Sequence, residues 1–258
     1  MKAFTWQHAP VICCIGVDRA VERNYIQLMT KLICFDFDGT LCNSWPPFQK
    51  AAVRFTEMNG LPELCLDSLM VGYGYPDEYE FWKGMDKQTQ RDTLETLYRI
   101  VDDPHHEIMD GNFPVLFDGV VDTLEGLKQN GHTLAIVTAR PRDPLNIILN
   151  HFDLRKYFDT VRDYDDVKDR GERCKPHPDQ LLSVMRELGF QSENTFMVGD
   201  TCMDMKMGTA AGVRTIGVTW GNHCINRLTE GGAVHVVSEK FSDLGDIIHN
   251  WRAEFEAA

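Results

Sequence analysis

The sequence predicts an α/β protein in which a parallel sheet carries a small, all-helical inserted domain. Two observations predict this fold class. Short apolar runs alternate with stretches of helical spacing, and the segment from 45 to 113 has helical periodicity without any apolar strand run. Strands that alternate with helices favour parallel pairing, because each crossover then carries a helix back across the sheet.

Four short runs have the composition expected of strands that are buried on both faces. They cover residues 32–35, 134–137, 195–198 and 215–218, and a weaker fifth run covers residues 234–237. Helical spacing lies between several of them, over residues 122–130, 178–188 and 203–211. A glycine follows each of these helical stretches, which is a common way for a helix to end. The order of the elements indicates a Rossmann-like sheet.

The segment from 45 to 113 contains two groups of residues that each share one helical face. They are Phe48, Ala51, Ala52, Phe55 and Met58, and then Leu94, Leu97, Tyr98 and Val101. We therefore expect a helical cap domain over residues 45–113, inserted into a core formed by residues 29–44 and 114–258. Residues 1–28 show no clear periodicity, so we expect them to form a poorly ordered extension.

Composition limits the partners and the location of the protein. The 258 residues carry a formal net charge of -13, which disfavours binding to a nucleic-acid backbone. The apolar run at residues 9–17 is too short to span a bilayer and lacks a small-residue cleavage site. Eight cysteines without a C-x-x-C pair are typical of reduced thiols. We expect a cytoplasmic protein without a membrane or nucleic-acid partner.

Two carboxylates directly follow the first apolar run. One residue separates Asp36 from Asp38, and Gly39 then permits a sharp turn. In open α/β sheets ligands bind beyond the carboxyl ends of the strands, so both side chains fall at the expected site. Adjacent carboxylates repel each other unless a cation lies between them, and Mg²⁺ prefers carboxylate and phosphate oxygens. An ordinary acidic turn would explain Asp36 alone, but it explains the whole Asp-x-Asp-Gly-Thr pattern less well.

Three further segments place polar groups at comparable positions. Thr138 ends the second run and could hold phosphate oxygens, although threonine ends many strands. Lys175 precedes a helix that Pro178 can start and could neutralise a phosphate, although an exposed loop lysine explains this segment better when it is taken alone. Asp200 follows the third run, and Asp204 lies four residues later. Helix capping accounts for one of these two aspartates better than for both.

In order and context, these segments resemble the four motifs of the haloacid dehalogenase-like superfamily of aspartyl phosphatases. The resemblance covers residues 31–248, and its first and fourth motifs, residues 36–40 and 199–204, are specific when found together. Thr138 and Lys175 match the second and third motifs, which are weak alone but stand in the correct order. The stretch 217–221 and the helical segment after the first motif are similar to the phosphoglycolate phosphatase branch. The chain departs from that branch after Thr138, where Ala139 and Arg140 stand in place of Asn-Lys.

The resemblance implies that the chain uses Mg²⁺ to hydrolyse small phosphate monoesters, which would be phosphoglycolate-like compounds or sugar or nucleotide phosphates. Asp36 would attack phosphorus and form an aspartyl-phosphate, and Asp38 would protonate the leaving alcohol and later accept a proton from water. The Asp36 carboxylate, the Asp38 carbonyl oxygen and Asp200 would bind Mg²⁺. Asp204 would support the metal site from outside, through water or Lys175.

The same resemblance assigns the phosphate-binding groups. Thr138 and Lys175 would hold phosphate oxygens, with Gly39 and Ala139 completing the site, and the cap would close over it. An acid at position 38 favours phosphoryl transfer over dehalogenation, because the dehalogenases of the superfamily lack it. Aromatic residues of the cap such as Trp45 match no substrate signature, and core packing is their commoner role.

Two alternatives stay open on the sequence. A sugar-phosphate mutase of the same fold would return the phosphoryl group to a sugar, and the motifs do not separate it from a phosphatase. A non-catalytic scaffold is disfavoured because all four motif elements are present. The expected partner is a small-molecule phosphate ester, and the expected assembly is a monomer or homodimer.

Overall fold

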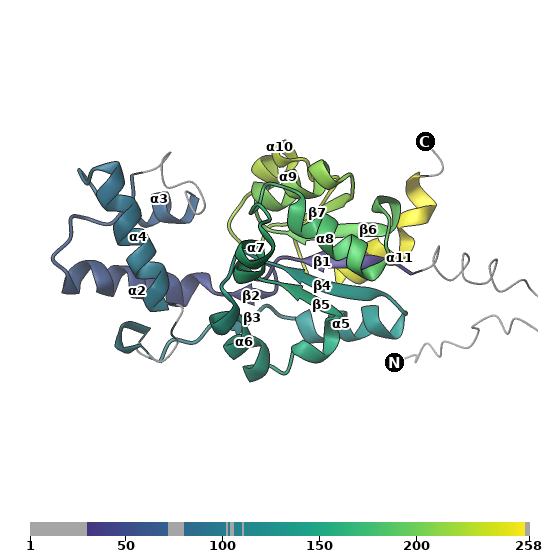
Figure 1. Cartoon of the computed structure of the whole chain (residues 1–258), viewed down its shortest axis with the longest axis horizontal. Coiled ribbons are helices and arrows are strands. Elements are labelled where there is room, and N and C mark those ends of the chain that lie inside the picture. The colour runs from purple at the N-terminus through teal and green to yellow at the C-terminus, as the bar shows by residue number, and fades with distance from the viewer. Residues whose placement is uncertain (1–29, 72–79, 102, 104–105, 110, 256–258) are drawn as a thin grey trace, which may run out of the picture.

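The computed structural model describes residues 30–71, 80–101, 103, 106–109 and 111–255 (Figure 1). The extension expected over residues 1–28 lies outside these residues. Within them, a six-stranded parallel sheet carries helices on both faces, and a group of helices lies to one side of it (Figure 1). None of the described helices is long and apolar enough to cross a membrane.

The sheet has the strand order β5-β4-β1-β6-β7-β8, and each pair of neighbouring strands in it is parallel. β1 lies inside the sheet between β4 and β6, with Leu32 in register with Thr133 and Thr195. The carboxyl ends of these three strands therefore meet at one edge. The strands are β1 (Leu32–Phe35), β4 (Thr133–Val137), β5 (Thr160–Arg162), β6 (Thr195–Gly199), β7 (Arg214–Val218) and β8 (His235–Val237).

Alternate residues of β1 face opposite layers of helices, as the two-residue period of a strand requires. Ile33 and Phe35 pack in one apolar cluster with helices α5 (Val120–Gln129), α6 (Arg142–His151) and α11 (Asp243–Phe255). Leu32 and Cys34 pack in another cluster with α8 (Asp179–Leu188) and α9 (Cys202–Ala211). The shorter helices of this part are α7 (Tyr164–Arg170) and α10 (Ile225–Gly231), with 3₁₀ turns η2 (Arg155–Tyr157) and η3 (Ser192–Asn194).

Residues 45–113, which we call the insertion, contain α2 (Trp45–Met58), α3 (Leu66–Val71), α4 (Lys87–Val101) and the 3₁₀ turn η1 (Glu107–Met109). These helices lie beside the sheet and not on its faces (Figure 1). They have an apolar cluster of their own, formed by Phe48, Ala51, Ala52, Phe55, Leu69, Phe81, Trp82, Leu94, Leu97, Ile108 and Met109. At the two ends of the insertion, β2 (Cys42–Asn43) pairs antiparallel with β3 (Val115–Leu116). That the insertion is a separate cap domain stays a prediction.

The predicted fold class is confirmed, because the five predicted strands lie in one parallel sheet flanked by helices. Sequence analysis missed β5, a three-residue edge strand that contains a charged residue, Arg162, which is buried against Glu187. The residues from Phe48 to Met58 that share one helical face all lie in α2, but Met58 is not buried with the others. Met58 is the last residue of α2 and is 56% exposed, so the buried face ends one turn earlier, at Phe55.

Candidate active site

Three carboxylates gather at the carboxyl ends of β1 and β6. Asp36 follows β1, Asp200 follows β6, and Asp204 lies in the first turn of α9. One oxygen from each carboxylate lies within 4.8 Å of the others, and all three residues are buried. The backbone N–H of Asp36 donates to the carbonyl oxygen of Val198 at 2.9 Å, which ties the end of β1 to that of β6. The sheet itself therefore brings together aspartates that are far apart in sequence.

Lys175 lies between two of these carboxylates. Its Nζ is 2.8 Å from Oδ1 of Asp36 and 2.6 Å from Oδ1 of Asp204, and its side chain is only 7% exposed. The other oxygen of Asp204 accepts from the backbone N–H and the hydroxyl of Thr201, so this aspartate also caps α9. Asp204 thus caps the helix and also lies beside Asp36 and Lys175, whereas the sequence presented capping and a place in the site as alternatives. We call Asp36, Asp200, Asp204 and Lys175 the acid centre.

The acid centre holds more negative charge than its one lysine balances. Burial, followed by repulsion from Asp204, raises the pKa of Asp36 to about 7. Burial and the charges of Asp36 and Asp204 raise the pKa of Asp200 well above its ordinary range. Burial alone would lower the pKa of Lys175, but the carboxylates of Asp204 and Asp36 hold it above its ordinary value. A divalent cation would relieve this imbalance, and the donors are the oxygens that Mg²⁺ prefers.

Asp200 is enclosed by the loop after β1 and the loop after β7. The hydroxyl of Thr40 donates to its Oδ1 at 2.9 Å, and the backbone N–H of Asn222 donates to its Oδ2 at 2.8 Å. Gly39 has a φ of +73°, and a Cβ atom on it would lie 2.2 Å from Asp200 Oδ2. A Cβ on Gly221 would come equally close. Both positions therefore require glycine for the backbone to approach the carboxylate.

Asp38 does not belong to the three-carboxylate group. Arg140 holds it with two hydrogen bonds, from Nε to Oδ2 at 2.9 Å and from Nη2 to Oδ1 at 2.8 Å. Burial would raise the pKa of Asp38, but the charge and hydrogen bonds of Arg140 hold it below its ordinary value. Metal binding through the backbone carbonyl oxygen of Asp38 does not involve this carboxylate, and it stays a prediction.

The two residues after β4 lie next to this ion pair. Thr138 is 1% exposed, and its hydroxyl accepts from the backbone N–H of Arg140 at 3.1 Å. Ala139 is exposed and lines the cavity described below. The phosphate-binding roles expected for Thr138, Ala139, Gly39 and Lys175 stay predictions.

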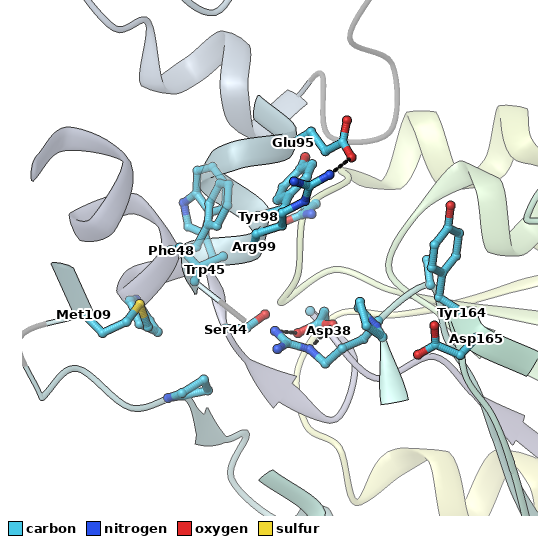
Figure 2. A pocket seen from close by; sticks show the side chains of 18 of the residues that line it. Asp38, Ser44, Trp45, Phe48, Glu95, Tyr98, Arg99, Met109, Tyr164 and Asp165 are labelled. Carbon is cyan, nitrogen blue, oxygen red and sulfur yellow. Dashed lines mark hydrogen bonds and ion pairs between the residues drawn. The ribbon is translucent and has the colours of Figure 1, made fainter. Parts of the chain in front are cut away.

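A cavity of about 560 Å³ opens between the insertion and the sheet (Figure 2). Asp38, Gly39, Ala139 and Asn222 line it on the side of the acid centre. Aromatic residues line it on the side of the insertion; they are Trp45, Phe48 and Tyr98.

Sequence reasoning missed several polar contacts of the site. Arg140 was noted only because it departs from the phosphoglycolate phosphatase pattern. That departure was the signal that could have marked Arg140 as a residue of the site. Thr40 lies within the first motif, directly after Gly39, but no role was given to its hydroxyl. Asn222 follows the stretch 217–221, whose resemblance to that branch marked the loop without indicating its contact with Asp200.

Fold and site together define an enzyme with a buried aspartate centre at the carboxyl edge of a parallel sheet. Residues 33–218 match the family model of the haloacid dehalogenase-like hydrolases. Because the match covers most of the chain, the protein belongs to this hydrolase family.

Curated relatives and solved structures agree with this assignment. Pyrophosphatase PpaX of Oceanobacillus iheyensis is 31% identical over 218 residues, which is 84% of this chain and 95% of that protein. Phosphoglycolate phosphatase of Escherichia coli is 30% identical over 210 residues, which is 73% of this chain and 81% of that protein. A haloacid dehalogenase-like hydrolase of Streptococcus pneumoniae shares the fold, with a TM-score of 0.66 at 18% identity over 84% of this chain and 97% of that one. The predicted superfamily and the prediction of a hydrolase are confirmed.

Proposed function

We propose that this chain is a Mg²⁺-dependent phosphatase that hydrolyses small phosphate monoesters through an aspartyl-phosphate on Asp36. The observation that carries the proposal is the convergence of Asp36, Asp200 and Asp204 with Lys175 at the ends of β1 and β6. Relatives that are named as phosphatases support the same class of reaction.

The donor set of the acid centre suits Mg²⁺. Three buried carboxylates face a single lysine, and the raised pKa values of Asp36 and Asp200 report the cost of charging both without a further cation. The carboxylates of Asp36 and Asp200, together with the Asp38 carbonyl oxygen, would hold the ion, and Asp204 would support them through Lys175. When bound, Mg²⁺ would neutralise the carboxylates and the oxygens of the transferred phosphoryl group.

The residues of the chain carry the two chemical steps. An oxygen of Asp36 attacks phosphorus, the bond to the leaving alcohol breaks, and Asp38 gives that alcohol a proton. Asp38 then accepts a proton from the water that attacks the aspartyl-phosphate, which releases phosphate and restores Asp36. Lys175 and Thr138 hold the phosphate oxygens during both steps.

Arg140 must release Asp38 for this chemistry to occur. Its two hydrogen bonds favour the ionised carboxylate, whereas a general acid has to carry a proton. Binding of the phosphate dianion gives the guanidinium another partner, and Asp38 is then free to turn to the leaving alcohol. The described cysteines carry free thiols, which supports the proposal of a cytoplasmic enzyme.

The test is a screen of phosphorylated metabolites in which released phosphate is measured with Mg²⁺ and with EDTA. We expect hydrolysis that EDTA abolishes and that the Asp36→Asn variant lacks. Hydrolysis that survives complete chelation would refute the metal assignment. Conversion of a hexose 1-phosphate to its isomer without free phosphate would identify a mutase in place of a phosphatase.

A further inference from the structure

The cavity between the insertion and the sheet is lined by aromatic rings on one side and, on the other, by residues next to the acid centre. At one side, Asp38 and Gly39 belong to the loop that follows β1, and the backbone N–H of Asn222 donates to Asp200. In the proposed reaction Asp38 protonates the leaving alcohol, and Asp38 lines this cavity, so the leaving group of a phosphate bound at the acid centre would extend into it. The volume of about 560 Å³ falls within the range of small-molecule sites and exceeds the needs of a two-carbon leaving group.

Three rings of the insertion form one side of the cavity, and we call them the aromatic wall. Trp45 and Phe48 come from α2 and Tyr98 comes from α4. The rings of Trp45 and Phe48 lie 5.5 Å apart, and those of Phe48 and Tyr98 are stacked with centroids 5.6 Å apart. Phe48 is buried, whereas Trp45 and Tyr98 are half-buried. Trp45 and Tyr98 therefore keep side-chain surface open to a ligand. The rings therefore support one another in fixed positions.

A fourth ring lies across the cavity. Figure 2 shows Trp45 and Phe48 on one side of Asp38 and Tyr164 on the other. Lys168 lies over the Tyr164 ring, with Nζ 4.4 Å from its centroid. The cavity thus has aromatic surface contributed by both the insertion and α7.

The charges along the cavity do not favour a second anionic group. Three acidic and three basic side chains line it; they are Asp38, Glu95 and Asp165, and Arg99, Arg140 and Lys168. The lining therefore has no excess of positive charge for a carboxylate or phosphate on the leaving group, and in the proposed reaction Arg140 is taken up by the substrate phosphate. An uncharged ring would instead cover apolar surface of the wall that a small acid would leave exposed to water.

We propose that the cavity binds the leaving group of the substrate and that this group carries a planar ring, as in a nucleoside 5′-monophosphate. This inference rests on the proposed phosphatase function and names its substrate class. Trp45 and Tyr98 are then specificity-determining residues, because their open ring surfaces stack on the base while the phosphate occupies the acid centre.

The experiment compares three substrates in which the phosphate is esterified to the primary C5 hydroxyl of ribose. Adenosine and uridine 5′-monophosphates carry a base on ribose, whereas ribose 5-phosphate has the same phosphate ester without a base. We expect the kcat/KM of the intact chain for at least one nucleotide to exceed that for ribose 5-phosphate by about tenfold, which is the scale of stacking plus burial of one ring.

Variants of the wall then test the cause of the preference. Trp45→Leu and Tyr98→Leu should each lower the ratio of the two kcat/KM values by about fivefold, whereas Tyr98→Phe, which keeps the ring, should retain it. Met58→Leu is the matched control, because Met58 lies on α2 but is exposed and outside the cavity. Using a ratio removes general losses of activity or folded protein from the comparison.

The outcomes separate the two proposals. Mg²⁺-dependent hydrolysis of ribose 5-phosphate without any preference for the nucleotides, or a preference that both leucine variants retain, would overturn the substrate class and leave the phosphatase intact. Absence of hydrolysis of every ester at saturating Mg²⁺ would overturn both.

Discussion

The aromatic wall lines the cavity and the acid centre lies next to residues that line it, but the two regions are held in place differently. Asp36 and Asp200 follow neighbouring strands, so hydrogen bonds of the sheet fix their backbones. Trp45 and Tyr98 lie on separate helices of the insertion, and packing against Phe48 fixes their rings. On the two proposals above, the chemical step would depend on strand ends, whereas the choice of substrate would depend on the packing of side chains. Changes in the two regions should have different consequences, and the following predictions test that difference.

The largest effect is expected at the nucleophile. Asp36→Asn removes the attacking carboxylate and should lower kcat by about ten thousandfold or more, because loss of a covalent nucleophile leaves only binding and electrostatic effects. Steady-state phosphate release measures the loss, and circular dichroism checks that the variant is folded. A variant within tenfold of the original activity would contradict the assigned role.

Two glycines with similar backbone conformations offer a matched pair. Gly39 and Gly60 have φ values of +73° and +59°, so alanine strains the backbone at either position. Only at Gly39 would the added Cβ collide with Asp200; nothing lies within 4 Å of it at Gly60. Gly39→Ala should therefore lower activity by about a hundredfold through displacement of Asp200. Gly60→Ala should cost about 1 kcal/mol of stability and keep full activity. Equal losses of activity in the two variants would refute the inference that the backbone at Gly39 must approach Asp200 closely.

The contribution of Asp36 to the stability of the Mg²⁺-free protein should fall as pH rises. The pKa of Asp36 is about 7 in the folded chain against an ordinary value of 3.8, so the folded state binds the proton more tightly. Its contribution to the free energy of unfolding is full below pH 3.8 and is lost as pH rises through about 7.

In the proposed site Mg²⁺ would bind the ionised carboxylates, so the rise in Tm on adding Mg²⁺ should be larger at pH 8 than at pH 5. Thermal unfolding at both pH values, with and without the ion, measures this difference. If the rise in Tm on adding Mg²⁺ were smaller at pH 8 than at pH 5, the metal assignment would be contradicted. Ca²⁺ is a useful companion ion, since a larger hard cation tests whether the site distinguishes between the two.

The smallest effects are expected from two ion pairs. Arg140 holds Asp38 with side chains that are 13% and 19% exposed, so Arg140→Gln should cost about 1 to 3 kcal/mol of stability. The Arg99–Glu95 pair of the insertion is 76% and 65% exposed, so Arg99→Gln should cost less than about 1 kcal/mol. Urea denaturation of both variants gives the comparison, and equal costs would mean that burial does not distinguish the pairs.

The sequence predicted the parts of the site that local motifs determine. Asp36 and Asp200 each directly follow a buried apolar run, and parallel pairing then brings them to one edge. The pairing of Asp38 with Arg140 was not predicted, because it depends on side-chain directions across two separate loops. β5 was missed because a three-residue strand with a buried arginine lacks an apolar run.

The aromatic wall could not be identified from sequence, because core and cavity aromatics have the same helical or loop context. Trp82 is fully buried, and its indole N–H donates to Thr56. Trp45 lies in the same insertion and lines the cavity. Only the packing of α2 against α4 separates these two roles. The motifs that were specific enough to predict the chemistry therefore carry no information about the substrate.

The most direct test of the account is to look for a phosphoryl group on Asp36 during turnover. The chain would be mixed with Mg²⁺ and a hydrolysed ester, quenched in acid within one turnover, digested, and analysed by mass spectrometry. We predict a phosphoryl group on the peptide that contains Asp36, and none in the Asp36→Asn variant. Hydrolysis that proceeds while this peptide stays unmodified, or a phosphoryl group on another residue, would contradict the central claim.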